Sequence, residues 1–321
     1  MKKSRLISLF FALLIPASSQ AATCLWVSSY TPNYEWNDGI GRGLHSGLAG
    51  QCDLLEFHLD TKRNRSSEFA QAQAKKALAY IQQTKPDLII ASDDNASKYL
   101  VKPYLKDGSI PVVFCGINWS VKEYGYPYKN ATGMIEVAPV QPLINEAKKV
   151  LHNPKKALYL TSDVKSSRKD FKQFSRLFSL AGIQLKGYFA ETMQEWKKGF
   201  KDAQNYDFII IGSNGGINDW QRDSVLSFVQ QQSTKFSLAF HNWMAPFAMV
   251  TFNKIAEEQG EWAATVAIEI LNGADPQQIP ISPNRRWKIY ANPQLLAKNG
   301  YQLSPRTQRN AINIAPKTHA D

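Results

Sequence analysis

The sequence has few cysteines and lacks the short motifs that mark common catalytic, metal and nucleotide sites. Its 321 residues include three cysteines and five histidines, which excludes a scaffold held by many disulfides. It contains no Gly-x-Ser-x-Gly elbow, no His-Glu-x-x-His pair and no Gly-x-x-x-x-Gly-Lys phosphate loop. The stretch from Gly39 to Gly43 is glycine-rich, but Leu44 stands where the dinucleotide fingerprint needs its third glycine. These absences favour a protein that is not an enzyme and needs neither a metal nor a cofactor.

Long apolar runs are absent after the first residues of the chain. Three basic groups lie within the first five residues, and a ten-residue apolar run follows at Leu6–Ile15. Small residues then lead up to Ala21, as in a secretory signal peptide. The alternative is an uncleaved anchor, but the run is shorter than the roughly 20 residues that span a bilayer. We therefore expect residues 1–21 to be removed near Ala21 and the mature protein to be periplasmic.

The cysteines are placed so that two of them can pair after export. Cys24 opens one apolar run and Cys52 opens the next. If these runs are neighbouring parallel strands, both cysteines lie at one edge of a sheet, and a Cys24–Cys52 disulfide is geometrically feasible in an oxidising compartment. Cys115 would then remain free. The alternative is three reduced, buried cysteines.

The excess of basic residues does not point to a partner. The formal charge of +11 becomes +8 when residues 1–21, with three basic and no acidic groups, are removed. The remaining positive charge is scattered in pairs such as Lys148-Lys149 and Lys197-Lys198, without a nucleic-acid-binding motif around it. We interpret the charge as a solvated surface and expect no nucleic-acid partner.

Apolar strands alternate with helical segments over most of the chain, which predicts an α/β fold with parallel sheets covered on both faces. The pattern begins a second time after residue 137, so we expect two α/β lobes. A helix at Glu261–Leu271 and the tail from Ile289 would return to the two lobes in turn. The predicted strands are Cys24–Ser29, Cys52–Leu59, Asp87–Ser92, Ile110–Gly116, Thr132–Val137, Ala157–Thr161, Ile183–Phe189, Phe208–Ile211 and Phe236–Phe240.

Polar and aromatic residues recur at the carboxyl ends of these strands, where open α/β sheets bind their ligands. A cleft lined in this way suits a small polar or aromatic molecule. Helix capping is the alternative role for residues such as Asn95 and Ser213, and packing is the alternative for Trp119 and Trp243. The candidate ligand-binding residues are Tyr30, Trp36, Asp93, Asn95, Asn118, Ser162, Ser213, Asn214 and Asn242.

Several of these strand ends belong to longer stretches that resemble one family. The chain resembles the type 1 periplasmic binding proteins of the ABC-transporter substrate-binding family, and the related extracellular sensor domains of bacterial signalling proteins. The resemblance covers essentially the whole mature chain. The stretches that carry it are Ser29–Asp38, Pro86–Asn95, Ile110–Asn118, Thr132–Glu136 and Ala264–Asp275.

The resemblance implies two interleaved Rossmann-like lobes joined by a three-crossing hinge that closes on a ligand. We place the crossings near Ile135, Trp243 and Ile281. The N-terminal lobe would then comprise residues 22–135 and 244–280, and the C-terminal lobe residues 136–243 and 281–321. The resemblance implies ligand contact for the matching positions, namely Tyr30, Trp36, Asp93, Asn95 and Asn118. The candidates in the second lobe follow mainly from their strand ends.

The resemblance implies a monomeric solute-binding protein that captures a small molecule for an ABC permease. Some relatives bind aromatic amino acids, which fits the aromatic strand ends of this chain. The alternative is a ligand-sensing protein that signals to a membrane sensor kinase or cyclic-dinucleotide enzyme. An exported hydrolase is a third hypothesis, which the missing motifs disfavour.

Overall fold

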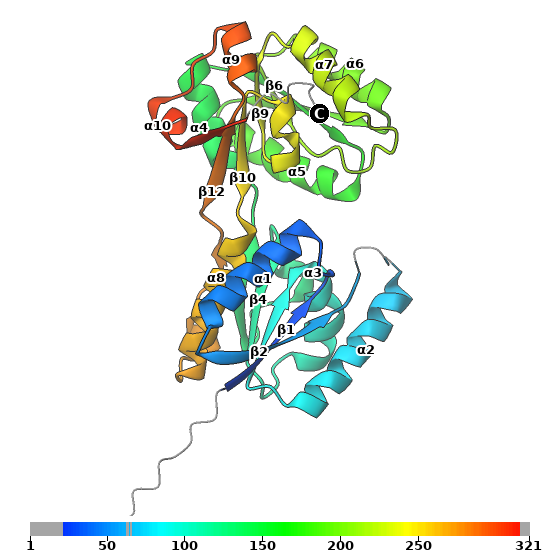
Figure 1. Cartoon of the computed structure of the whole chain (residues 1–321), viewed down its shortest axis with the longest axis vertical. Coiled ribbons are helices and arrows are strands. Elements are labelled where there is room, and N and C mark those ends of the chain that lie inside the picture. Colours follow the sequence, from blue (N-terminus) through cyan, green and yellow to red (C-terminus); the bar gives the residue numbers. More distant parts are fainter. Residues whose placement is uncertain (1–21, 62–63, 65, 315–321) are drawn as a thin grey trace, which may run out of the picture.

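The computed structural model describes residues 22–61, 64 and 66–314, and the predicted signal peptide at residues 1–21 lies outside this range. The chain forms two lobes along the long axis of the molecule, each built around one sheet (Figure 1). This confirms the predicted α/β class with two interleaved lobes. In the part of the chain described, no helix is long and apolar enough to cross a membrane.

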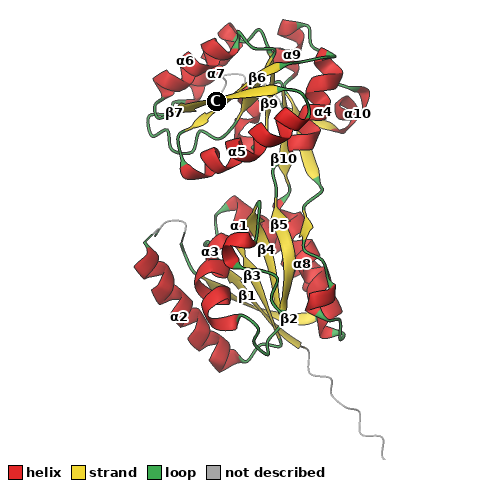
Figure 2. Ribbon diagram, turned by 180° about the vertical axis from the view of Figure 1, so that it is seen from behind, coloured by secondary structure: helices red, strands yellow, loops and turns green. Residues whose placement is uncertain are grey.

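The first lobe contains a sheet with the strand order β11-β5-β4-β3-β1-β2, in which all neighbours are parallel. Its strands are β1 (Ala22–Ser28), β2 (Cys52–His58), β3 (Leu88–Ser92), β4 (Val112–Asn118), β5 (Ala131–Glu136) and β11 (Ser282–Pro283). Both faces of the sheet are covered (Figure 2). In β1, for example, Leu25 and Val27 pack in one core cluster while Cys24 and Trp26 pack in the other.

The second lobe contains a sheet with the order β13-β12-β10-β9-β8-β6-β7, in which only β10 and β12 are antiparallel. Its strands are β6 (Lys156–Ser162), β7 (Gln184–Ala190), β8 (Phe208–Ile211), β9 (Phe236–Ala239), β10 (Val250–Lys254), β12 (Trp287–Ala291) and β13 (Ala311–Asn313). Strands β6, β8 and β9 are buried along nearly their whole length, as expected for parallel strands between two layers of helices.

Helices cover the sheets and begin and end at recognisable signals. Ser66 caps α2 by accepting a hydrogen bond from the backbone N–H of Phe69 at 3.1 Å, and Lys85 ends that helix in a left-handed conformation before Pro86. The helices are α1 (Glu35–Leu48), α2 (Ser67–Thr84), α3 (Asp93–Ala96), α4 (Val140–Leu151), α5 (Lys165–Leu180), α6 (Met193–Ala203), α7 (Arg222–Gln232), α8 (Ala256–Leu271), α9 (Pro293–Asn299) and α10 (Pro305–Asn310).

The glycine-rich stretch that lacks a nucleotide fingerprint lies within α1 and packs against α8. A Cβ atom at Gly43 would lie 2.4 Å from the carbonyl oxygen of Glu257. On the facing helix, a Cβ atom at Gly260 would lie 2.1 Å from the carbonyl oxygen of Ile40. The glycines therefore permit close helix packing, and this accounts for their spacing without a bound nucleotide.

The chain crosses between the lobes after β5, after β10 and after β11. The first crossing is within a few residues of the expected position near Ile135. The second was expected near Trp243, but β10 pairs with β9 and β12 of the second sheet, so the chain crosses only after Lys254. The third lies beyond Pro283, because β11 still pairs with β5 of the first sheet. Residues 244–254 therefore belong to the second lobe, and residues 281–283 to the first.

The predicted disulfide between Cys24 and Cys52 is confirmed, with Cα atoms 5.9 Å apart. It joins the neighbouring parallel strands β1 and β2. Their register sets Cys24 beside Leu54 and Ala22 beside Cys52, so the disulfide runs diagonally between the strands. Cys115 is buried and free, as the same hypothesis requires.

Candidate functional site

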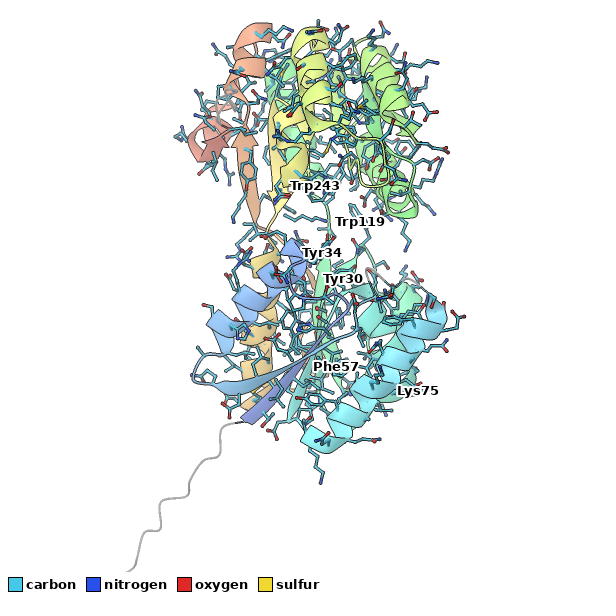
Figure 3. The ribbon with its side chains drawn as sticks, turned by 45° about the vertical axis from the view of Figure 1, so that its right-hand side comes forward. Tyr30, Tyr34, Phe57, Lys75, Trp119 and Trp243 are labelled. Atoms are coloured by element: carbon cyan, nitrogen blue, oxygen red, sulfur yellow. A yellow bond between two sulfur atoms is a disulfide. The ribbon has the colours of Figure 1, made fainter. Side chains whose placement is uncertain are left out.

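The carboxyl ends of the strands in the two sheets face each other across the hinge. Strand β5 leads from Glu136 directly into the second lobe, and β4, β3 and β1 run parallel to it. Strand β10 leads from Lys254 directly into the first lobe, and β9, β8 and β6 run parallel to it. We call the residues that follow these strand ends the interlobe surface. Tyr30, Tyr34, Trp119 and Trp243 lie on it in Figure 3.

Trp36 and Asp93 meet on the interlobe surface of the first lobe. The indole N–H of Trp36, at the start of α1, donates to Asp93 Oδ1 at the end of β3, with a distance of 3.0 Å. Tyr30 belongs to the same group, because β1 pairs with β3 in a register that sets Ser28 beside Ser92. Burial and then the charges of Asp93 and Asp94 raise the pKa of the Tyr30 hydroxyl well above the ordinary value. Its ring packs edge-on against Tyr34, with centroids 5.1 Å apart. Three predicted ligand-binding residues are therefore brought together.

The backbone around Asp93 is shaped for this position. Asp93 is only 1% exposed and has a left-handed φ of 67°, which is uncommon for a residue other than glycine. Gly116 in β4 also has positive φ, and a Cβ atom there would lie 2.8 Å from Asp93 Oδ1. Glycine at position 116 therefore leaves the space that the carboxylate occupies.

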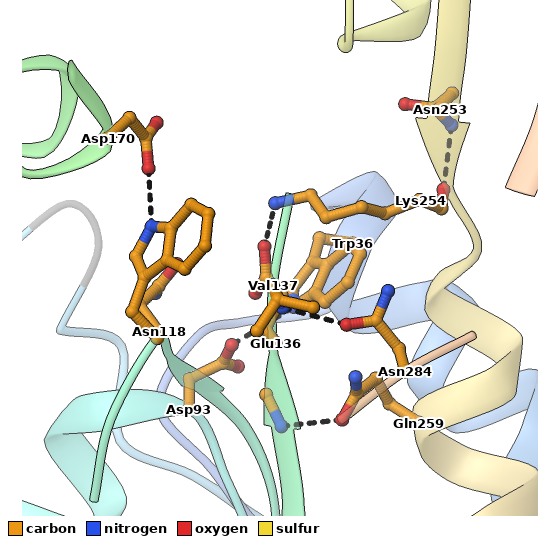
Figure 4. A network of polar contacts seen from close by, with 12 residues as sticks. Trp36, Asp93, Asn118, Glu136, Val137, Asp170, Asn253, Lys254, Gln259 and Asn284 are labelled. Carbon is orange, nitrogen blue, oxygen red and sulfur yellow. Dashed lines mark hydrogen bonds and ion pairs between the residues drawn. The ribbon is translucent and has the colours of Figure 1, made fainter. Parts of the chain in front are cut away.

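A buried ion pair adjoins this group at the hinge (Figure 4). The ammonium of Lys254, on the second crossing, contacts the carboxylate of Glu136, on the first crossing, and lies 5.4 Å from the centre of the Trp36 ring. Burial raises the pKa of Glu136, although the nearby ammonium opposes this shift. Burial lowers the pKa of Lys254, but the charges of Glu136 and Asp170 outweigh it, so the net direction is upward. The sequence pattern gave no signal for this pair.

Two further predicted residues of the first lobe are held in hydrogen bonds within that lobe. Asn118 donates from its side chain to Asp94 Oδ2 at 2.8 Å, and the hydroxyl of Tyr124 donates to the other oxygen of the same carboxylate at 2.5 Å. Asn95 donates from its side chain to the hydroxyl of Thr61 at 2.9 Å, on the side of β2. Asn118 lies beside the Trp36–Asp93 group, whereas Asn95 points toward a different loop.

The predicted residues of the second lobe follow β6, β8 and β9 and so lie on the interlobe surface. Ser162 donates from its hydroxyl to the carbonyl of Gly215 at 3.2 Å, and the hydroxyl of Ser213 accepts from the N–H of that glycine at 2.9 Å. Asn214 begins the turn that follows β8, and its carbonyl accepts from Ile217 at 3.0 Å. These serines and the turn form one cluster.

Asn242 lies apart from this cluster. Its backbone N–H donates to Asn253 Oδ1 at 3.1 Å, and its own side-chain oxygen accepts from the N–H of Trp243 at 2.9 Å. Trp243 is 52% exposed and stacks on His241 with centroids 4.4 Å apart. Burial lowers the pKa of His241 well below its ordinary value, so the imidazole is neutral at pH 7. The second lobe thus presents an exposed indole at Trp243, for which packing was the alternative role.

A further interlobe contact involves Asp170, which was not among the predicted site residues. The indole N–H of Trp119, which follows β4 in the first lobe, donates to Asp170 Oδ1 in α5 of the second lobe at 2.7 Å. Burial raises the pKa of Asp170, against the opposing effects of Lys254 and of this hydrogen bond. A charged residue on a helix normally indicates a solvated face, so the pattern gave no reason to choose it.

A cavity of about 770 Å³ lies elsewhere, lined by Lys149, Tyr301 and Arg306 among others. It adjoins the end of α4, just before β6 begins. It therefore lies near the amino ends of the strands, away from the interlobe surface at their carboxyl ends. None of the predicted ligand-binding residues lines it, so the cavity is separate from the candidate site.

Comparisons with known proteins agree with this arrangement. A family model described as ABC transporter substrate binding protein matches residues 35–314. No curated protein sequence matches the chain.

Solved structures with the same fold share little sequence with this chain. The ligand-free, open structure of a substrate binding protein with adhesive properties from Clostridium difficile has a TM-score of 0.71 at 14% identity, covering 92% of this chain and 100% of that one. The ABC domain in complex with L-Trp from Streptococcus pneumonia has a TM-score of 0.61 at 16% identity, covering 91% and 100%. A periplasmic ribose ABC transporter from Conexibacter woesei has a TM-score of 0.58 at 13% identity, covering 91% and 98%. Because the family model spans most of the sequence, the chain belongs to the ABC transporter substrate binding proteins, with the type 1 periplasmic binding protein fold.

Proposed function

We propose that this protein is an exported solute-binding protein that captures an aromatic amino acid between its lobes for an ABC importer. The observation that carries this proposal is the Trp36–Asp93 pair, which sets an indole beside a carboxylate on the interlobe surface. An aromatic amino acid presents the complementary groups, a ring that stacks on an aromatic face and an ammonium that pairs with a carboxylate.

The charges of the interlobe surface support a ligand with an ammonium group. Around Tyr30 and Trp36, four carboxyl groups accompany the ammonium of Lys254, and that ammonium already pairs with Glu136. The carboxyl groups of this cluster favour a cationic group on the ligand. The carboxyl groups are those of Asp93, Asp94, Glu136 and Asp170.

The second lobe would supply the remaining contacts on closure. The hydroxyl of Ser213, which accepts from the N–H of Gly215, provides a hydrogen-bond donor for the carboxylate of an amino acid. The exposed indole of Trp243 provides a second aromatic face. The structure in complex with L-Trp from Streptococcus pneumonia shares this fold and supports an aromatic amino acid as the class of ligand. We propose that bending at the three crossings brings these groups onto the ligand.

A thermal-shift screen of the mature protein over amino acids, sugars, nucleosides and polyamines tests the proposal. A ligand at about 100 times its dissociation constant adds roughly 2.7 kcal/mol of stability. We expect stabilisation by tryptophan, tyrosine or phenylalanine and not by sugars. Stabilisation by sugars or nucleosides alone would replace the proposed ligand class.

The membrane partner is tested by the neighbouring genes. Genes for a permease and an ATPase beside this one would support import. A lone sensor kinase or cyclic-dinucleotide enzyme in that position would contradict import and favour the signalling alternative, which uses the same interlobe site.

A further inference from the structure

Trp119 is anchored in both lobes at once. Its backbone N–H donates to the carbonyl of Glu136 at 2.9 Å, at the end of β5 where the chain first crosses. Its side chain packs against the core of the second lobe, edge-on to the buried Phe174 with centroids 6.4 Å apart. The indole N–H bonds to Asp170 in α5 at 2.7 Å. A residue of the first lobe thus contributes to the packing of the second.

The backbone of Trp119 is held in an unfavourable conformation. Its φ of 62° lies in the left-handed region, which is sterically unfavourable for a bulky residue. A residue with a large side chain persists in this conformation only where the surrounding contacts determine it. Three contacts surround Trp119, namely those with Asp170, Phe174 and the carbonyl of Glu136.

The contact lies at the hinge and not at the outer rim of the lobes. Trp119 adjoins the first crossing through Glu136, and Asp170 interacts electrostatically with Lys254 on the second crossing. Points near a hinge axis move little when the lobes rotate about it. The bond between Trp119 and Asp170 can therefore persist while the lobes open and close.

We propose that the Trp119–Asp170 contact is a pivot, a non-covalent connection beside the three chain crossings that confines the lobes to one closing motion. Without it, the ligand-free lobes sample orientations from which they cannot close on a ligand. The fraction of protein molecules in a binding-competent orientation then falls, and the apparent affinity falls with it. The effect on affinity rests on the proposed function, whereas the effect on lobe orientation requires no ligand.

Interlobe distances measured by pulsed electron paramagnetic resonance test the pivot. Spin labels are attached to cysteines that replace the exposed Lys75 in α2 and Lys198 in α6 of the mature protein. Trp119→Phe keeps a ring but loses the N–H, and Asp170→Leu loses the acceptor. Both variants should broaden the distance distribution of the ligand-free protein. Asp170→Asn retains an oxygen acceptor and should restore the wild-type width, which separates the hydrogen bond from the charge.

Lys169→Ala is the matched control. It removes an ion pair with Glu123 that spans the same two lobes at 3.6 Å, but both side chains are more than half exposed, and such pairs contribute little. It should leave the distribution unchanged. Wild-type widths in both Trp119→Phe and Asp170→Leu would overturn the pivot, and so would broadening in Asp170→Asn equal to that in Asp170→Leu.

The ligand found by the thermal-shift screen supplies a second readout. Trp119→Phe should raise its dissociation constant roughly tenfold, which corresponds to about 1.4 kcal/mol. An unchanged constant together with a broadened distribution would contradict the link between pivot and affinity. A wild-type protein that binds none of the screened compounds would count against the proposed function, and the distance distributions would still decide on the pivot.

Discussion

The indole nitrogen of Trp36 lies 3.0 Å from Asp93 Oδ1, which joins the start of α1 to the end of β3. Above the same ring lies the ammonium of Lys254, 5.4 Å from its centre. A carboxylate, an aromatic face and an ammonium from three separate segments therefore adjoin one another where the two lobes meet.

Replacing Trp36 or Asp93 should abolish ligand-induced thermal stabilisation without unfolding the protein. Trp36→Ala removes the aromatic face and the donor to the carboxylate. Asp93→Asn keeps the shape and tolerates the left-handed backbone, but removes the charge. Thermal melts with and without ligand measure the effect, and Glu35→Ala, at an exposed neighbouring position, is the control. Undiminished stabilisation in both variants would disprove the assignment of these residues to the site.

Lys254→Met should destabilise the protein by about 3–5 kcal/mol, because it leaves the carboxylate of Glu136 buried without its partner. Removal of the ammonium raises the pKa of Glu136 further, since burial already shifts it upward. When a carboxyl has a higher pKa in the folded protein than in the unfolded chain, the free energy of unfolding falls as the pH rises from the unfolded pKa to the folded pKa. The loss should therefore be larger at pH 8 than at pH 5.

Urea unfolding of the wild type and the variant at both pH values measures this difference. Lys254→Met combined with Glu136→Gln removes the unpaired charge and should recover most of the lost stability. An equal loss at the two pH values, or a larger loss at pH 5, would contradict the role of the buried carboxylate.

The fold followed from the sequence because parallel strands covered on both faces are continuously apolar. The predicted strand Asp87–Ser92 differs by one residue from β3, at Leu88–Ser92. The second crossing was misplaced because β10 is a five-residue strand within a longer apolar stretch. Its pairing with β9 and β12 depends on segments far along the chain, which local periodicity does not reveal.

Most of the candidate site was predicted because its residues lie at or directly after the ends of strands, whereas Trp36 was chosen from the segment beyond the first strand that carries the family resemblance. Tyr30 and Asp93 follow neighbouring strands of one sheet, so their proximity could be expected from the α/β pattern. The pairing of Lys254 with Glu136 joins residues 118 positions apart, and nothing in the local sequence pattern links the two. Asn95 matches the same strand-end rule but bonds to Thr61, because a polar residue at a strand end also serves the adjoining loop.

The Cys24–Cys52 disulfide closes a segment of the chain with a sequence separation of 28 residues. A cross-link over such a segment contributes about 3–4 kcal/mol by restricting the unfolded chain. Cys24→Ser combined with Cys52→Ser should lower the stability by this amount in chemical denaturation. Reduction of the wild type should have the same effect. Cys115, the third cysteine of the chain, is free, so reduction breaks only the Cys24–Cys52 bond. A stability that neither treatment changes would rule out this contribution.

Gly43→Ala should destabilise the first lobe although alanine favours helices. The change gains up to about 1 kcal/mol of helix propensity. The new Cβ atom would, however, lie 2.4 Å from the carbonyl oxygen of Glu257 in α8, and overpacking of this kind costs roughly 1–3 kcal/mol. Because the obstructing atom belongs to a backbone, relief requires that α8 move away from α1.

Ser46→Ala, on the exposed face of the same helix, is the matched control for Gly43→Ala. It offers a smaller gain in helix propensity and meets no neighbouring helix, so its urea midpoint should equal or exceed that of the wild type. The Gly43 variant should unfold at a lower midpoint than both. A midpoint above the wild type for Gly43→Ala would show that the two helices can separate at little cost, and that the glycine is not required for their packing.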